Sequence, residues 1–132
     1  MQGDGSLTGQ IVGEIGVAIA VERLLRAGFL VAVPIVDDGY DLLAFSGRRY
    51  WRIQVKATAS EGKNSTRIRI GCGKDKTKRY CPKHVDAIVA VHIRSRLCIC
   101  ASVASCGSAA WLNFSQHKDG DFSPLLRIQK HK

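Results

Sequence analysis

Hydrophobic and polar positions along the chain predict one helix followed by a series of short strands. Residues 7–27 carry apolar side chains at steps of three and four, which is the spacing of one helical face. Gly28 is a natural stop for this helix. The predicted apolar face consists of Ile11, Ile15, Ala18, Val21 and Leu25.

Strand-like segments follow the helix. They cover residues 29–36, 41–45, 50–56, 66–70, 85–93 and 97–103. The turn at 46–49 predicts a hairpin, so the first three strands form a meander. The continuous apolar run at 85–93 is typical of a central strand. The last part is less regular, and we expect a short helix near 109–114 and a final segment that packs back on the body.

This order predicts an α/β fold with a mixed central β-sheet flanked by helices, in a single domain over residues 1–132. No apolar run is long enough to cross a membrane. The first residues have neither a basic nor an apolar signal region. We therefore expect an intracellular, cytoplasmic protein that does not bind a membrane.

Positive charge is concentrated in one part of the chain. The net charge is +9, yet residues 48–83 hold twelve Lys and Arg against two acids, and the rest holds eight against nine. A focused basic surface attracts polyanions, and nucleic acid is the commonest one in cells. A merely solvated surface is the alternative, but solubility does not need such clustering.

Five cysteines are present, an odd number that argues against a disulfide framework in an intracellular protein. Most of them are interpreted as small buried apolar residues. A structural zinc site is the alternative, although no CxxC pair occurs. Its ligands would be Cys72, Cys81, His84 and either Cys98 or Cys100.

Four polar residues disagree with their local pattern. Glu14 shares the apolar face of the predicted helix, unless it lies at the edge of that face and reaches water. Asp41 begins a strand after a turn, where it is either functional or an ordinary turn residue. Gln54 and Lys56 leave one face of the strand 50–56, opposite the apolar Trp51, Ile53 and Val55.

The hairpin places positions near 41 and 54 opposite each other, so Asp41, Gln54 and Lys56 can converge. A carboxylate and an amide oxygen suit a hard divalent cation such as Mg²⁺. The lysine can position a metal-bound water or stabilise charge on a phosphate.

The segments "GE" at 13–14, "YDLLAF" at 40–45 and "RIQVKAT" at 52–58 resemble the PD-(D/E)XK nuclease core over about residues 7–104. The order is similar to the family pattern of a helical Glu, an Asp at a strand start and then acid-x-Lys. Two branches are most similar: the group I intron-encoded homing endonucleases, which similarly carry Gln-x-Lys, and the archaeal-type Holliday junction resolvases.

The resemblance implies a restriction-endonuclease-like core and a Mg²⁺-dependent endodeoxyribonuclease, with Mn²⁺ as a second suitable ion. It implies catalytic roles for Glu14, Asp41, Gln54 and Lys56, and metal ligands at Asp41, Gln54, Glu14 and the Val55 carbonyl. Gln54 departs from the Glu or Asp of most members. The alternative is therefore a non-catalytic nucleic-acid-binding module that retains the fold.

The basic segment predicts phosphate contacts to duplex or branched DNA. These come from Arg48, Arg49, Arg67, Arg69, Lys74, Lys76, Lys78 and Arg79. Trp51 and Tyr80 can stack on bases, but the place of Trp51 in the apolar stripe favours the core. One active site cuts one strand, so we expect a homodimer or a higher homo-oligomer.

Overall fold

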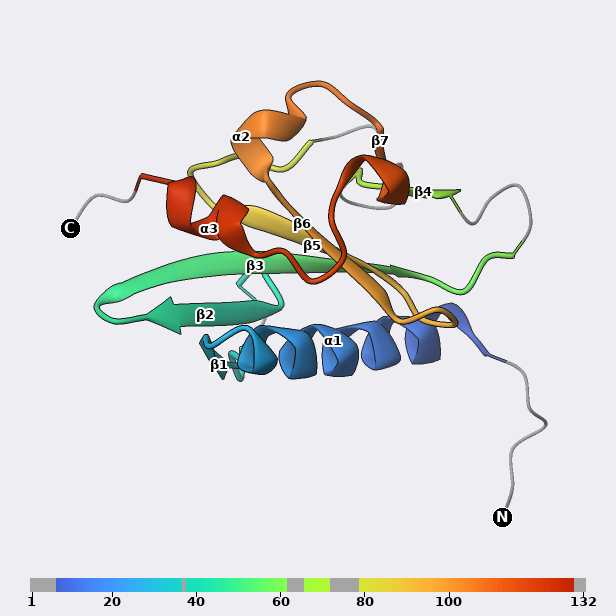
Figure 1. The fold of residues 1–132 in the computed structure, drawn as a ribbon, viewed down its shortest axis with the longest axis horizontal. Coiled ribbons are helices and arrows are strands. Elements are labelled where there is room, and N and C mark those ends of the chain that lie inside the picture. Colours follow the sequence, from blue (N-terminus) through green and yellow to red (C-terminus); the bar gives the residue numbers. More distant parts are fainter. Residues whose placement is uncertain (1–6, 37, 62–65, 72–78, 130–132) are drawn as a thin grey trace, which may run out of the picture.

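The computed structural model describes residues 7–36, 38–61, 66–71 and 79–129. Figure 1 shows the order of the elements along the chain. The helices are α1 (Gly9–Arg26), α2 (Val103–Cys106) and α3 (Ser123–Arg127), with a 3₁₀ turn at Phe114–Gln116. The strands are β1 (Leu30–Ala32), β2 (Leu42–Ser46), β3 (Arg49–Thr58), β4 (Arg67–Arg69), β5 (Ala87–His92), β6 (Leu97–Ser102) and β7 (Trp111–Asn113).

Within these described ranges, a five-stranded sheet has the order β1-β2-β3-β5-β6. The neighbours β1–β2, β2–β3 and β5–β6 are antiparallel, whereas β3 and β5 are parallel. The predicted mixed sheet and its meander are therefore confirmed. The middle strand is β3, not β5, although β5 is buried along its whole length as its apolar run predicts.

The long central strand β3 changes partner halfway along. Its first half pairs with β2 from Arg49 to Ile53, and its second half pairs with β5 from Ile53 to Thr58. Because β2 is short, its pairing with β3 stops at Ile53. Gln54 and Lys56 thus lie just beyond the point where β2 pairing ends.

The helix α1 matches the predicted segment closely. The Thr8 hydroxyl accepts a hydrogen bond from the Ile11 N–H at 3.2 Å, which caps its start. Gly28, at φ +96°, follows its last turn, where a glycine tolerates the left-handed backbone. In the part of the chain that the structure describes, no helix is both long and apolar enough to span a bilayer.

The predicted apolar face of α1 is confirmed only in part, because Ile15 and Val21 pack against the core but lie at the edge of the buried face. Ile11 and Leu25 are 43% and 51% exposed, and Glu14 is exposed rather than core-facing. The helix is apolar on several sides, so periodicity did not single out one face. The sheet selects the face with the small residues, which comprises Gly16, Ile19, Ala20 and Leu24.

The helix packs through this face because its backbone comes very close to β3 at Gly16. A Cβ built on Gly16 would lie against the Cβ of Ala57, on the β3 face that carries Trp51, Ile53 and Val55. Trp51 is fully buried there, which confirms its assignment to the core. Phe29 packs edge-on against its ring at 5.8 Å between ring centroids.

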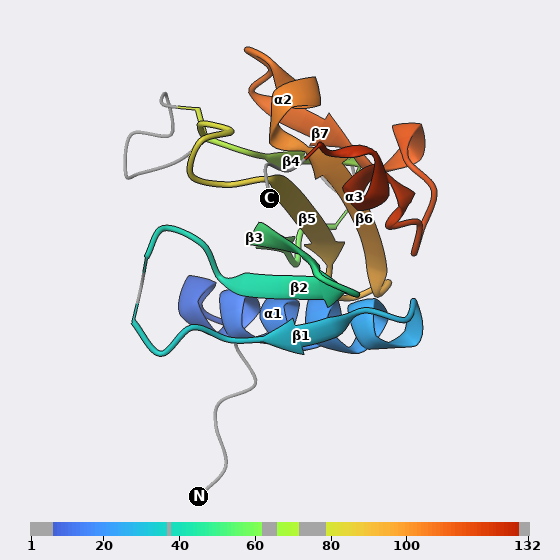
Figure 2. The same ribbon diagram turned by 90° about the vertical axis from the view of Figure 1, so that its left-hand side faces the viewer.

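The two faces of the sheet carry separate cores. Figure 2 shows α1 on one side and β4, β7 and α2 on the other. The α1 side holds the apolar stripe of β3, and Leu125 of α3 is fully buried in the same cluster. The final segment therefore packs back on the body as predicted. Ile88 and Ile99 face the other way and pack with Ile68 and Leu112.

The predicted strand 66–70 exists as β4, but it pairs with β7 in a sheet of its own rather than with the meander. The helix predicted near 109–114 is wrong, because this segment forms β7 and then the 3₁₀ turn. The strand predicted at 29–36 is also shorter, since β1 stops at Ala32 before Pro34, which cannot donate to a ladder.

Candidate active site

The β2–β3 hairpin brings Asp41 beside Gln54. Leu42 pairs with Ile53, and the Asp41 N–H donates to the Ile53 carbonyl at 2.8 Å. Beyond that pair the printed register ends, and Asp41 contacts β3 at Ile53 and Val55, the two neighbours of Gln54. The tight turn at Gly47 and Arg48 fixes the register, so position 41 lies next to position 54 as the hairpin predicts, and the convergence of the Asp41, Gln54 and Lys56 side chains stays a prediction.

The Asp41 carboxylate also holds β3 directly. Its Oδ2 accepts a hydrogen bond from the Val55 N–H at 2.8 Å. This N–H lies past the end of the β2 ladder, so the carboxylate takes the place of a missing strand partner. Asp41 is half-buried, and its position is set by both its backbone and its side chain.

Gln54 and Lys56 lie on the β3 face that points away from α1, and both are half-buried. The Lys56 Nζ donates to the Gly71 carbonyl at 3.0 Å and lies 5.1 Å from the centroid of the Tyr80 ring. Gly71 follows β4, so the lysine links β3 to the segment after that strand. Tyr80, a predicted base-stacking residue, is partly buried and packs on the core of this face.

Glu14 is not brought into this group by any described contact. It is exposed on α1, two residues before the contact between Gly16 and Ala57. Among the described residues, no group of three or more His, Cys, Asp and Glu could hold a metal ion. Position 54 is an amide and Glu14 has no described contact with Asp41, so the roles of both residues in metal binding stay predictions.

The oxygen donors present nevertheless fit a hard divalent ion. Magnesium is held by one or two carboxylates and keeps several waters, so it does not need an all-protein cage. Asp41 has a carboxylate with lone pairs for more than one partner, and Gln54, which lies between the two β3 residues that Asp41 bonds, has an amide oxygen. A ligand role for the Val55 carbonyl stays a prediction.

The predicted DNA-contacting arginines of the hairpin behave differently from each other. Arg48 is exposed in the turn. Arg49 donates to the carbonyls of Leu126 and Ile128 at 3.0 and 2.9 Å, and its guanidinium lies 4.8 Å from the Trp51 ring centroid. Arg49 therefore ties the C-terminal helix to β3 in this structure.

The other predicted DNA contacts lie on or near β4. Arg67 and Arg69 are exposed on the strand. Arg79 donates to the Ser108 carbonyl at 3.3 Å, which links it to the turn after α2. Three further members fall outside the described residues, namely Lys74, Lys76 and Lys78.

An ion pair that the sequence did not reveal lies two residues before Gln54. Asp86 is almost fully buried, and its Oδ2 accepts from the Arg52 N–H at 2.7 Å and from Arg52 Nε at 3.1 Å. The hydrogen bond to Asp86 raises the pKa of Arg52 above its ordinary value. The pair fixes the start of β5 against β3, as Asp41 does on the other edge. Its only sequence signal was an acid directly before an apolar strand.

Trp111 is a second residue that sequence reasoning missed. It is 37% exposed, and the guanidinium carbons of Arg67 and Arg69 lie 4.2 and 5.4 Å from the centroid of its ring. With Lys56 and Thr58 it lines a cavity of about 440 Å³. No local alternation marks residues 111–113 as a strand, because β7 forms only by pairing with β4.

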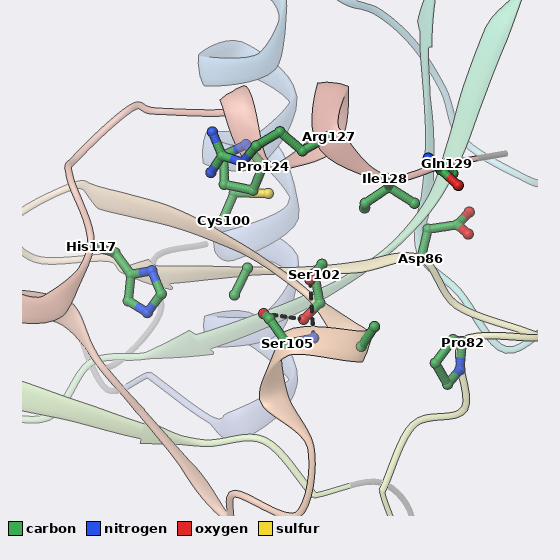
Figure 3. A pocket seen from close by; sticks show the side chains of 12 residues that line it. Pro82, Asp86, Cys100, Ser102, Ser105, His117, Pro124, Arg127, Ile128 and Gln129 are labelled. Atoms are coloured by element: carbon green, nitrogen blue, oxygen red, sulfur yellow. Dashed lines mark hydrogen bonds between the residues drawn. The ribbon is translucent and has the colours of Figure 1, made fainter.

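A larger cavity, of about 510 Å³, lies apart from this group. Figure 3 shows its lining, in which Ser102 and Ser105 are hydrogen-bonded to each other and which also includes His117 and Arg127. None of Asp41, Gln54 and Lys56 lines it. We therefore assign the candidate chemistry to the β2–β3 edge and not to the larger hollow.

The structure separates the residues of the alternative zinc site. Cys98 and Cys100 share one face of β6 and are buried in the α1-side core, whereas Cys81 and His84 are exposed. Burial raises the pKa of the Cys98 thiol to about 12 and also raises the pKa of Cys100. Both are therefore neutral, apolar members of the core. Cys72 lies outside the described residues.

Comparisons with known proteins agree with this geometry. The family model described as PD-(D/E)XK endonuclease matches residues 8–111. A solved structure of a bacterial homing endonuclease, I-Ssp6803I, is similar in fold, with a TM-score of 0.67 and 21% sequence identity. That likeness covers 81% of this chain and 78% of the other. No curated protein sequence matches the chain significantly. Since the family match spans most of its residues, the chain belongs to the PD-(D/E)XK endonuclease family.

Proposed function

We propose that this protein is a metal-dependent endonuclease that hydrolyses phosphodiester bonds in DNA. The observation that carries the proposal is the edge of β3, where Asp41 bonds the Val55 backbone beside Gln54 and Lys56. Members of the family typically use divalent metal ions. A carboxylate, an amide oxygen and an ammonium in one place suit the binding and cleavage of a phosphodiester.

Each residue has a definite task in this proposal. A bound Mg²⁺ or Mn²⁺ supplies Lewis acidity and an acidified water. Asp41 holds the ion, and its hydrogen bond to Val55 keeps the carboxylate in place. Lys56 orients the attacking water and stabilises the negative charge that develops on the phosphate. The Gly71 carbonyl and the Tyr80 ring keep the ammonium of Lys56 in position.

The side chain of Gln54 sets the affinity of the proposed site for a metal ion. An amide in place of a carboxylate removes one negative charge, which lowers the affinity for a divalent cation. This departure supports the alternative of a DNA-binding module that has lost catalysis. We favour activity because Asp41 and Lys56 are both present and because the Gln-x-Lys pattern is similar to that of a homing-endonuclease branch.

Among the types of endonuclease, we propose a homing-like enzyme that acts on duplex DNA. Its support is the Gln-x-Lys motif together with the fold shared with a bacterial homing endonuclease. A Holliday junction resolvase, acting on branched DNA, is the second candidate. Since one active site cleaves one strand, we expect a homodimer or a higher homo-oligomer, measured by light scattering.

The proposal is tested by incubating the protein with supercoiled plasmid, linear duplex and a four-way junction. Each substrate is presented with Mg²⁺, with Mn²⁺ and with EDTA. We expect cleavage only with a divalent ion, and a loss of at least about 100-fold in Asp41→Asn and Lys56→Ala. Asp41→Asn keeps an oxygen for the Val55 N–H, so it changes the charge more than the fold.

Matched controls separate chemistry from general charge effects. Asp38→Asn removes an exposed acid of the same loop, and Lys118→Ala removes an exposed lysine on another part of the surface. Both should cleave like wild type. If wild type is as inert as Lys56→Ala on every substrate, the enzyme proposal is wrong. Retained DNA binding would then support the non-catalytic module. Cleavage confined to the junction would favour the resolvase.

A further inference from the structure

The small sheet formed by β4 and β7 presents polar and aromatic side chains on one face. Its register pairs Arg67 with Asn113 and Arg69 with Trp111, and antiparallel partners share a face. Ile68 and Leu112 occupy the other face and are buried in the core. The outward face therefore carries two arginines, an asparagine and a tryptophan.

The arginines of this face are held in place before any ligand arrives. Both guanidinium groups lie over Trp111, at 4.2 Å for Arg67 and 5.4 Å for Arg69. Such stacking fixes a planar guanidinium at less entropic cost when it binds. The side chain of Asn113 makes no capping hydrogen bond to the 3₁₀ turn that follows it.

This face lies next to the candidate active site. Lys56, Arg67, Arg69 and Trp111 line the same cavity of about 440 Å³. Lys56 also bonds the carbonyl of Gly71, two residues after β4 ends. Any DNA held at Lys56 therefore meets the β4–β7 pair within a short distance along the duplex.

We propose that the outward face of β4–β7 enters the major groove and reads base edges beside the cleaved bond. The inference rests on the proposed nuclease function. A two-stranded ribbon fits this groove, and Arg and Asn are the side chains that make paired hydrogen bonds to guanine and adenine. Strands of three residues cover about 10 Å, or about three base pairs at about 3.4 Å each.

This inference changes the expected role of two residues. From sequence, Arg67 and Arg69 were phosphate contacts that give affinity without sequence choice. A phosphate contact needs only a positive charge within reach, and a flexible side chain suffices for it. Two stacked guanidinium groups beside an asparagine on a rigid ribbon are instead the arrangement that distinguishes one base from another.

The test is a binding selection from a randomised duplex library in EDTA, so that no strand is cut. We expect wild type to enrich a motif that includes about three adjacent base pairs. Arg67→Lys keeps the positive charge but loses the planar guanidinium with its paired hydrogen-bond donors. It should reduce the preference at one position by about 5- to 100-fold, while the salt dependence of binding stays the same. Trp111→Ala should weaken the base preference at several neighbouring positions of the DNA motif at once, because both arginines stack on its ring.

Arg48→Ala serves as the phosphate-type comparison, since Arg48 is exposed in the hairpin turn. It should weaken binding to all sequences alike and reduce the salt slope by about one. The inference is overturned if wild type enriches no motif. It is also overturned if Arg67→Lys keeps the wild-type motif. Circular dichroism of each variant shows that its fold is intact.

The selection separates this inference from the nuclease proposal. An enriched motif in a protein that cleaves nothing with Mg²⁺ or Mn²⁺ supports base reading and contradicts the enzyme. Cleavage with Mg²⁺ and no enriched motif supports the enzyme and contradicts base reading. Neither result depends on knowing the target sequence in advance.

Discussion

Gln54 stands where the family resemblance implies a Glu or Asp. It lies where β2 pairing ends, between Ile53 and Val55, which both bond Asp41, so we expect its side chain to contribute to the same site. An amide oxygen carries no formal charge, and the affinity of oxygen sites for divalent ions rises with the number of charged ligands. We therefore expect the side chain at position 54 to set how much metal the proposed enzyme needs.

Gln54→Glu should lower the Mg²⁺ concentration for half-maximal cleavage by about 10-fold, because it adds a carboxylate beside Asp41. The measurement is plasmid cleavage against Mg²⁺ concentration. Gln54→Ala is the matched control and should need more Mg²⁺ than wild type. An unchanged or higher requirement in the Glu variant would show that position 54 does not contact the ion.

The buried thiol of Cys98 should make the folded protein less stable at alkaline pH. Burial raises its pKa to about 12, whereas a thiol in the unfolded chain titrates near 8.5. Between these values the unfolded state loses a proton that the folded state keeps. The free energy of unfolding should thus fall as pH rises from about 8.5, by up to about 1.4 kcal/mol per pH unit.

Urea unfolding at pH 8, 9 and 10 measures this effect. Cys98→Ala should show a shallower decline than wild type, and Cys81→Ser, which changes an exposed thiol, should follow wild type. Equal slopes in all three proteins would mean that the Cys98 thiol is not protected by the core.

For single residues, the local sequence pattern predicted the position of some side chains and not of others. Asp41 and Gln54 could be placed together because a short hairpin leaves few possible registers. Trp51 could be assigned to the core from strict alternation. The position of Glu14 could not be decided, because an apolar helix offers several faces and only the partner surface selects one; the structure shows Glu14 exposed, as the alternative interpretation had it.

At the scale of elements, the contact between α1 and β3 depends on the absence of a side chain. A Cβ on Gly16 would meet the Ala57 Cβ far inside normal contact. The same helix carries Gly13, whose added Cβ would have nothing within 4 Å. A side chain is therefore excluded at Gly16 but has room at Gly13, three residues earlier in the same helix.

Gly16→Ala should destabilise the protein by about 1–3 kcal/mol through overpacking, despite the better helix propensity of alanine. Adding Ala57→Gly in the same chain should restore part of this loss. Gly13→Ala is the control and should stabilise by about 0.5–1 kcal/mol. Denaturant unfolding measures all four proteins, and a neutral Gly16→Ala would contradict the close packing.

Element prediction succeeded where pairing is local and failed where it is distant. The meander β1–β2–β3 joins neighbours in sequence, and its strands were located correctly. The strand β7 becomes a strand only through β4, more than forty residues earlier in the chain. A segment of three residues has too little pattern of its own to reveal such a partner.

For the whole molecule, the position of the charge matters more than its sum. All of the positive excess lies between residues 48 and 83, the part of the sequence that includes β3, β4 and Lys56. Among the described cations of this segment, Lys56, Arg67 and Arg69 line one cavity beside the candidate site. This distribution focuses a polyanion on the residues proposed to cut it.

Binding to non-specific duplex DNA should weaken steeply with salt. If about four cations neutralise phosphates, the logarithm of the association constant falls against the logarithm of salt concentration with a slope of about −4. Affinity should then drop about 100-fold between 50 and 200 mM salt. Fluorescence anisotropy in EDTA measures this. A flat salt profile would contradict a phosphate-binding surface.

The hydrogen bond from the Val55 N–H to Asp41 has a spectroscopic consequence. An ion that draws electron density from the carboxylate weakens this bond, so the amide proton should report occupancy without any DNA. We expect the Val55 amide resonance to move during a Mg²⁺ titration of wild type and to stay still in Asp41→Asn. The chemical shift of one backbone amide in the central strand would thus report how much of the protein has bound the ion.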